Sequence, residues 1–250
     1  MTPGEKVDKA VKILELIDGN VRHALKLQAY FCRAAYNDDV RARFEQSKAA
    51  SGYNQIVDSL YFELIMTLVR LYDDLPDSKN SENTASLPEL MELLSQTGVV
   101  AELQTRSERR KTPNGQLEKE LQTQDRGFLE KLNRDATLSA QTETSEIFSL
   151  LREFDKLKGS HLLAGLRSIR NELFAHTAIE RNRNNPARYG NAESLLDKTL
   201  QFVSRFNSAV INLHCSYQDY IQTWQEHADF FWQYTIGKEI EKPTFESSRR

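Results

Sequence analysis

The chain has 250 residues, enough for one large domain or two small ones, and a formal net charge of −3 at pH 7. That charge gives no global attraction to nucleic acid, so any RNA or DNA binding has to come from a local basic patch. Only 10 glycines and 6 prolines occur, and charged residues make up 28% of the chain. Few turns over this length favour long helices with solvated outer faces.

The N-terminal stretch has no apolar run of signal-peptide type. The longest apolar stretches fall far short of the ~20 residues that a membrane span needs. The two cysteines, Cys32 and Cys215, each lie in an apolar helical pattern, as expected of buried thiols in a reducing compartment. We therefore expect a soluble cytoplasmic protein without membrane contact.

Apolar residues at helical spacing predict a first long helix over residues 5 to 36. A polar break at Asn37 can cap the next helix, which is predicted to run from about Val40 to Asp74. The second half of that helix is apolar over more than one face, which is typical of the central helix of a bundle.

Proline, serine and asparagine mark residues 75–88 as a loop, and a short helix follows over Leu87–Gln96, ended by Gly98. Residues 99–133 are polar and mixed in sign, which favours an inserted helical arm or hairpin beside the core. We place this insertion at residues 76–140.

The helical pattern resumes at Ser145, and Ser160 can cap a further helix that carries the last part of the pattern. A loop over residues 181–190 precedes another long helix, predicted at Ala192–Trp224. No strand alternation and no solenoid repeat stands out. The sequence predicts an all-α bundle of four long core helices, with a helical insertion between the second and third.

The whole of residues 1–236 is expected to form a single domain, followed by a flexible tail over residues 237–250.

The stretch "SIRNELFAHTAIERNRNNPARYG" holds the candidate site: Arg170 and Asn171, followed by His176. The chain has no phosphate-binding glycine loop, no zinc-binding helix motif and no nucleophile elbow. None of the five histidines lies in a metal-binding spacing. The sequence therefore predicts chemistry that uses neither a metal nor a cofactor.

On a regular helix Arg170 and His176 point ~120° apart, with ~9 Å between them along the axis. This separation suits two groups that hold different parts of one extended ligand, such as a phosphodiester backbone. Arginine offers a permanent planar cation to phosphate oxygens, and histidine can transfer a proton near neutral pH.

The local charge favours a polyanion. The stretch Ser160–Gly190 holds two acids, Glu172 and Glu180, and five arginines, for a local sum of 5 − 2 = +3: Arg167, Arg170, Arg181, Arg183 and Arg188.

An ordinary structural interpretation stays open for the same residues. His176 would then interact with the last carbonyls of its helix or with Glu172, and Arg170 would pair with an acid on a neighbouring helix.

"RNELFAH" resembles the motif of the HEPN superfamily, in which an arginine, a polar residue directly after it and a histidine lie late in an all-α bundle. "YNQIVDSLYFELIMTLVRLYDD" resembles the second helix of the AbiU-type abortive-infection HEPN proteins, and Arg70 and Asp73 match its closing element. The resemblance covers residues 10 to 225. Thr177 and Ala178 depart from the charged pair that many AbiU-type members carry after the histidine.

The resemblance implies a metal-independent endoribonuclease of prokaryotic defence, acting as a toxin or phage-defence effector on single-stranded or loop RNA. His176 would transfer the proton, Arg170 would clamp the phosphate and Asn171 would orient them. Supporting roles would fall to Glu172, Arg167, Arg70 and Asp73, and an RNA-binding patch to Arg181, Arg183 and Arg188. Arg70 and Asp73 equally suit a charge pair that braces the helix end.

HEPN ribonucleases usually join two motifs across a dimer, so the resemblance also implies a homodimer, and an antitoxin or regulatory partner is possible. The aromatic-rich segment over residues 217–234 favours an interface as well. The alternative is a non-catalytic HEPN-like scaffold that binds a partner protein or a nucleotide.

Overall fold

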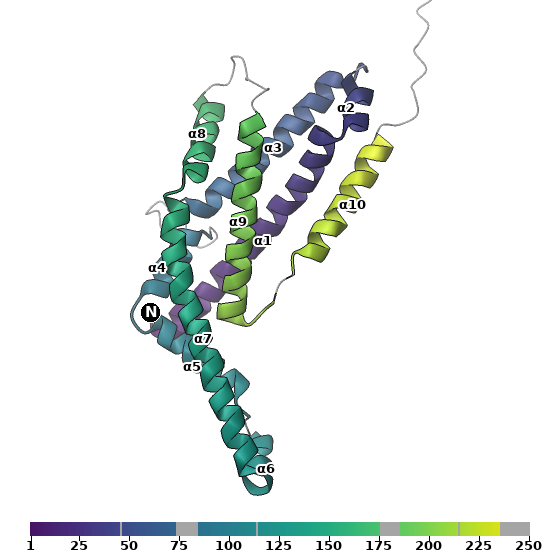
Figure 1. The fold of residues 1–250 in the computed structure, drawn as a ribbon. Helices are drawn as coiled ribbons and strands as arrows, with labels where there is room; N and C mark the ends of the chain where they lie inside the picture. The colour runs from purple at the N-terminus through teal and green to yellow at the C-terminus, as the bar shows by residue number, and fades with distance from the viewer. Residues whose placement is uncertain (46, 74–84, 114, 176–185, 215, 236–250) are drawn as a thin grey trace, which may run out of the picture. The chain divides into compact units, whose positions relative to one another are not determined.

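The computed structural model describes the chain except residues 46, 74–84, 114, 176–185, 215 and 236–250 (Figure 1). Every regular element of the described residues is an α-helix, which confirms the predicted all-α class. In chain order the helices are α1 Pro3–Tyr36, α2 Asp38–Glu45, α3 Ala50–Tyr72, α4 Leu87–Ser95, α5 Val99–Lys111, α6 Gly115–Gln124, α7 Arg126–Lys158, α8 His161–Ala175, α9 Pro186–Ile211 and α10 Gln218–Thr235. Among these helices, none combines the length and the apolar character that crossing a membrane requires.

The chain divides into two compact units, each built from two stretches of sequence. Unit 1 comprises Met1–Ala24 and Leu64–Tyr217, and unit 2 comprises Leu25–Glu63 and Gln218–Arg250. Both α1 and α3 run from one unit into the other without interruption. The single domain over residues 1–236 and the count of four core helices stay predictions.

The core of unit 1 is built around the second half of α3. Nearly all of its side chains are buried, as predicted for a central helix: Leu64, Ile65, Met66, Leu68, Val69, Leu71 and Tyr72. Aromatic rings from α7 and α9 continue this core, since Phe154 packs against Phe202 with ring centroids 6.1 Å apart. Each such buried side chain stabilises the fold by roughly 1.5–3 kcal/mol.

The predicted insertion is helical, but the long helix predicted to resume at Ser145 begins earlier. In Figure 1, α7 runs alongside α5 and α6 as one long helix. It begins after Asp125, whose carboxylate accepts the Phe128 N–H at 2.9 Å, and not at Ser145. The polar sequence of its first half conceals an apolar stripe of buried Leu129, Ala136 and Ala140, which packs this half against its neighbours.

The prediction of one helix over Val40–Asp74 is wrong, because α2 and α3 are separated by a turn. The Ser47 hydroxyl and N–H both donate to the Phe44 carbonyl, at 2.9 Å each, which closes the chain after α2. The turn allows the Phe44 ring to stack on Tyr53 at 4.6 Å, and both rings meet the edge of Trp232. Trp232 and Tyr53 are buried in unit 2.

The prediction of one helix over Ala192–Trp224 is also wrong at its C-terminal end. The helix α9 ends at Ile211, and Asn212 takes a left-handed conformation with φ of 55°. Asparagine tolerates this conformation better than most residues. The Leu213 N–H then donates to the Asn207 carbonyl at 3.0 Å, so the chain leaves the helix axis before α10 begins.

Candidate active site

The helix α8 carries Arg170 and Asn171 of the predicted motif and begins where expected. The Ser160 hydroxyl accepts the Leu163 N–H at 3.4 Å, which confirms Ser160 as the N-cap. One face of α8 is buried through Leu162, Leu163, Leu166 and Ile169. Arg167 and Arg170 lie one turn apart on the polar edge of this face, both partly exposed.

The last turn of α3 is fixed from inside the core. Tyr72 is fully buried, its ring lies parallel to that of Phe154 at 6.3 Å, and its hydroxyl is 2.7 Å from the Thr199 hydroxyl of α9. Burial raises the pKa of Tyr72 to about 12, because a buried phenolate would lack solvation. Asp73 follows directly, so its backbone is held by a rigid neighbour.

Asp73, Arg167 and Arg170 form a group that we call the arginine–aspartate cluster. Arg170 Nη1 lies 2.5 Å from Asp73 Oδ2, and Arg167 Nη2 lies 3.5 Å from Asp73 Oδ1. Arg167 Nη2 also donates to the Tyr72 carbonyl at 2.8 Å, where a cation interacts favourably with the end of α3. Two guanidinium groups and one carboxylate leave the cluster with a formal charge of +1.

The guanidinium of Arg170 is held on two of its nitrogens. Nη1 contacts Asp73, and Nε donates to Oδ1 of the neighbouring Asn171 at 3.3 Å. Asn171 is exposed and the Arg170 side chain is 23% exposed. Among the described residues, no contact of Nη2 adds to these two.

Several predicted site residues lie outside this description. His176, Arg181 and Arg183 are not among the described residues. Glu172 lies in α8 and Arg188 in α9, but their side chains are not described.

The structure separates the other predicted pair. Arg70 is exposed and does not contact the Asp73 carboxylate through its side chain; the Asp73 N–H donates only weakly to the Arg70 carbonyl, at 3.4 Å. Arg70 and Asp73 therefore do not form the charge pair considered from the sequence. Asp73 pairs instead with α8, as the structural interpretation of Arg170 expected for an acid on a neighbouring helix.

Two supporting residues were not identified from the sequence. Tyr72 and Thr199 fix the end of α3, yet they lie 127 positions apart. A tyrosine within the otherwise apolar end of α3 was the available signal, since a buried phenol usually finds a hydrogen-bond partner.

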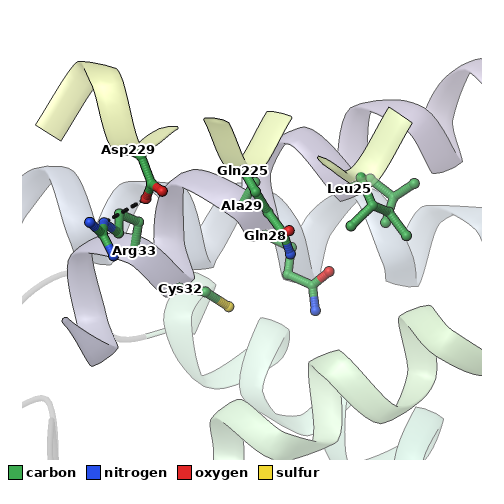
Figure 2. A pocket seen from close by; sticks show the side chains of 8 residues that line it. Leu25, Gln28, Ala29, Cys32, Arg33, Gln225 and Asp229 are labelled. Atoms are coloured by element: carbon green, nitrogen blue, oxygen red, sulfur yellow. Dashed lines mark ion pairs between the residues drawn. The ribbon is translucent and has the colours of Figure 1, made fainter. Parts of the chain in front are cut away.

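A separate pocket of about 350 Å³ lies in unit 2, between α1 and α10 (Figure 2). It is lined by Leu25, Gln28, Ala29, Cys32, Arg33, Ile221, Gln225 and Asp229. Its two charged groups form an ion pair, since Arg33 Nε lies 2.6 Å from Asp229 Oδ1, although the geometry is not that of a hydrogen bond. This pocket therefore has no uncompensated charge with which to select a ligand.

Metal-ligating side chains do not gather in the described part of the chain, where no group of three His, Cys, Asp or Glu could hold an ion. The described site offers a partly exposed guanidinium that the Asp73 carboxylate holds in place. Such a group stabilises negative charge on a phosphate.

The helical fold and the Arg170 and Asn171 pair on α8 agree with the HEPN class that the sequence resembles. Residues 10–231 match the family model described as AbiU2, and the chain belongs to this family of HEPN proteins. No curated protein and no solved structure matches the chain.

Proposed function

We propose that the protein is a metal-independent endoribonuclease of HEPN type. It acts in the cytoplasm as a toxin or phage-defence effector and cleaves single-stranded RNA or exposed loops. The observation that supports this most is the Arg170 guanidinium, which is fixed by Asp73 at 2.5 Å and still partly exposed. Membership of the AbiU2 family and the spacing from Arg170 to His176 support it further.

The reaction follows from the chemistry of RNA. The 2′-oxygen attacks the adjacent phosphorus and gives up its proton, while the bond from phosphorus to the 5′-oxygen breaks and that oxygen gains a proton. His176 exchanges one of these protons, and Arg170 stabilises the charge on the phosphorane. Asn171 orients the guanidinium through Nε. The products are a 2′,3′-cyclic phosphate and a 5′-hydroxyl.

Assembly as a homodimer completes this proposal. Residues spaced as Arg170 and His176 are would point ~120° apart on a regular helix, so two motifs facing one groove would supply both groups to one phosphate. Arg181, Arg183 and Arg188 add positive charge along the same RNA. A toxin of this kind implies an antitoxin or regulatory protein.

The decisive experiment compares wild type with His176→Ala on total RNA in the presence of EDTA, followed by end-group analysis. His176→Ala should lose at least ~10²-fold in rate, the low end for removing a general acid or base. The first-formed 5′ fragment should end in a cyclic phosphate. Equal cleavage by both proteins would identify a contaminating nuclease or another site.

A second comparison tests the arginine. Arg170→Ala should lose a similar factor, and Arg170→Lys should recover little because lysine lacks the planar fork. Arg106→Ala is the matched control, since Arg106 is also partly exposed and ion-paired, to Asp8 at 2.6 Å. The control should cleave at the wild-type rate.

The alternative function is a non-catalytic scaffold that binds a protein or a nucleotide. It is favoured by the ion pair between Arg170 and Asp73, which would also suit an arginine with a purely structural role. The absence of cleavage by an intact wild-type dimer would favour this alternative over the ribonuclease.

A further inference from the structure

We infer that Asp73 is the positioning residue of this site: its carboxylate holds the Arg170 guanidinium in the orientation that a phosphate requires. Arg167 in turn holds Asp73. The inference rests on the proposed function and assigns to Asp73 a role that acts through Arg170.

The first support is how the carboxylate is shared. Its two oxygens take different arginines, Oδ2 contacting Arg170 at 2.5 Å and Oδ1 lying 3.5 Å from Arg167. The hydrogen bond from Arg170 fixes Oδ2, and the longer ion pair with Arg167 attracts Oδ1, so the two contacts together favour one orientation of the carboxylate. Arg170 therefore meets an acceptor of fixed direction, and its own rotamer freedom is reduced before a ligand arrives.

The second support is the anchoring of the cluster to the buried core. Arg167 Nη2 binds the Tyr72 carbonyl at 2.8 Å, so it ties the carboxylate to the backbone of α3. Tyr72 is itself fixed by Thr199 of α9. Asp73 thus links the motif on α8 to a rigid helix end, which is what precise placement of a catalytic group requires.

The contacts and charges of the arginine–aspartate cluster show whether Asp73 orients Arg170 or blocks the place of the substrate phosphate. Asp73 contacts Nη1 of Arg170 and Asn171 contacts Nε, so neither of these two partners takes up Nη2. The two arginines outweigh the one carboxylate, so a phosphate approaches a net positive group. Asp73 therefore orients Arg170 and does not occupy the position of the substrate.

The test uses Asp73→Asn in the full-length protein, with single-turnover RNA cleavage and with filter binding of an RNA blocked by 2′-deoxy substitution. We expect kcat to fall about tenfold, within the range of coupling between contacting residues. The dissociation constant for the blocked RNA should hold or decrease, because the substitution removes a negative charge. Asp73→Glu keeps the charge and should restore part of the rate.

A double-mutant cycle shows whether Asp73 acts through Arg170. In an Arg170→Ala background, Asp73→Asn should change the residual rate less than twofold. A further tenfold loss in that background would overturn the inference, since Asp73 would then act independently.

Glu146→Gln is the matched control. Glu146 Oε1 lies 2.5 Å from Arg205 Nε, and its side chain is 36% exposed against 35% for Asp73. The control should leave both cleavage and RNA binding unchanged. Partly exposed ion pairs contribute little to stability, so both variants should melt close to wild type.

The remaining outcomes distinguish a failure of the proposed function from a failure of the inference about Asp73. A wild type that does not cleave removes the proposed function and this inference together. A cleaving wild type whose Asp73→Asn variant cleaves equally well overturns the inference alone. A faster Asp73→Asn variant would show that the carboxylate competes with the substrate, and weaker binding with a lower melting temperature would show a structural role; both results overturn it.

Discussion

At the scale of single residues, Tyr72 makes the free energy of unfolding decrease as the pH rises through the alkaline range. Its folded-state pKa of about 12 lies above the ordinary value of 10, so folding favours the protonated phenol. The stabilisation is complete below about pH 10 and is lost as the pH rises through about 12.

The variant Tyr72→Phe tests this dependence. At neutral pH it should lower the free energy of unfolding by about 1 kcal/mol, because the hydrogen bond to Thr199 is lost. At about pH 11 the difference from wild type should shrink or reverse, since phenylalanine has no proton to lose. Urea unfolding at both pH values measures it, and Tyr234→Phe, at a ring that is 68% exposed, is the control. If wild type and Tyr72→Phe differed in free energy of unfolding by the same amount at both pH values, Tyr72 would not cause the pH dependence.

Single residues of the candidate site also show how much of it could be predicted from the sequence. The Arg170 and Asn171 pair and the candidate Asp73 follow from short local patterns. The contact between Arg170 and Asp73 spans 97 positions, and no local pattern encodes a partner at that distance. Arg70, three positions before Asp73, was the nearer candidate partner, yet its side chain is exposed.

At the scale of elements, α4 depends on its N-cap. Ser86 is 1% exposed and its hydroxyl accepts the Glu89 N–H at 3.4 Å. Ser86→Ala would leave that N–H without its partner and should lower the free energy of unfolding by about 1 kcal/mol. Ser95→Ala, at the exposed end of the same helix, should stay within about 0.5 kcal/mol of wild type. Denaturant unfolding of the two variants gives the midpoints to compare. Equal midpoints would show that the Ser86 cap does not stabilise the protein.

The bounds of α1 and α4 and the start of α8 were predicted closely, whereas the capped start of α7 after Asp125 was missed. The break between α2 and α3 was missed because neither proline nor glycine lies between Phe44 and Ala50. Its cause is tertiary: Phe44 and Tyr53 meet around Trp232, which lies far along the chain. Apolar periodicity continues through such a turn and cannot reveal it.

At the scale of the whole molecule, we expect a two-fold homodimer in which exposed aromatics of α10 take part. Phe230 is 64% and Tyr234 is 68% exposed, and their rings lie 4.3 Å apart. Exposed aromatic pairs favour protein contacts. Trp232 and Tyr217 are buried within the protomer, so only part of the aromatic-rich segment is available for an interface.

Light scattering at micromolar concentration should give a dimer for wild type. The double variant Phe230→Ser and Tyr234→Ser should shift the equilibrium toward monomer, since two exposed aromatic side chains of α10 are removed. Leu117→Ser, at an exposed apolar residue of α6 in unit 1, is the control and should stay dimeric. A wild-type monomer would contradict the expectation.

The position of the tryptophans has an optical consequence. The chain holds two, Trp224 and Trp232, and both lie in α10 of unit 2. Trp232 is buried with its indole N–H on the Tyr30 carbonyl, and the Lys26 ammonium lies 4.4 Å from the Trp224 ring. Indole fluorescence therefore reports on unit 2 alone, whereas circular dichroism reports on the helices of both units. A difference between the two unfolding midpoints would measure directly how independently the unit that carries Arg170 unfolds.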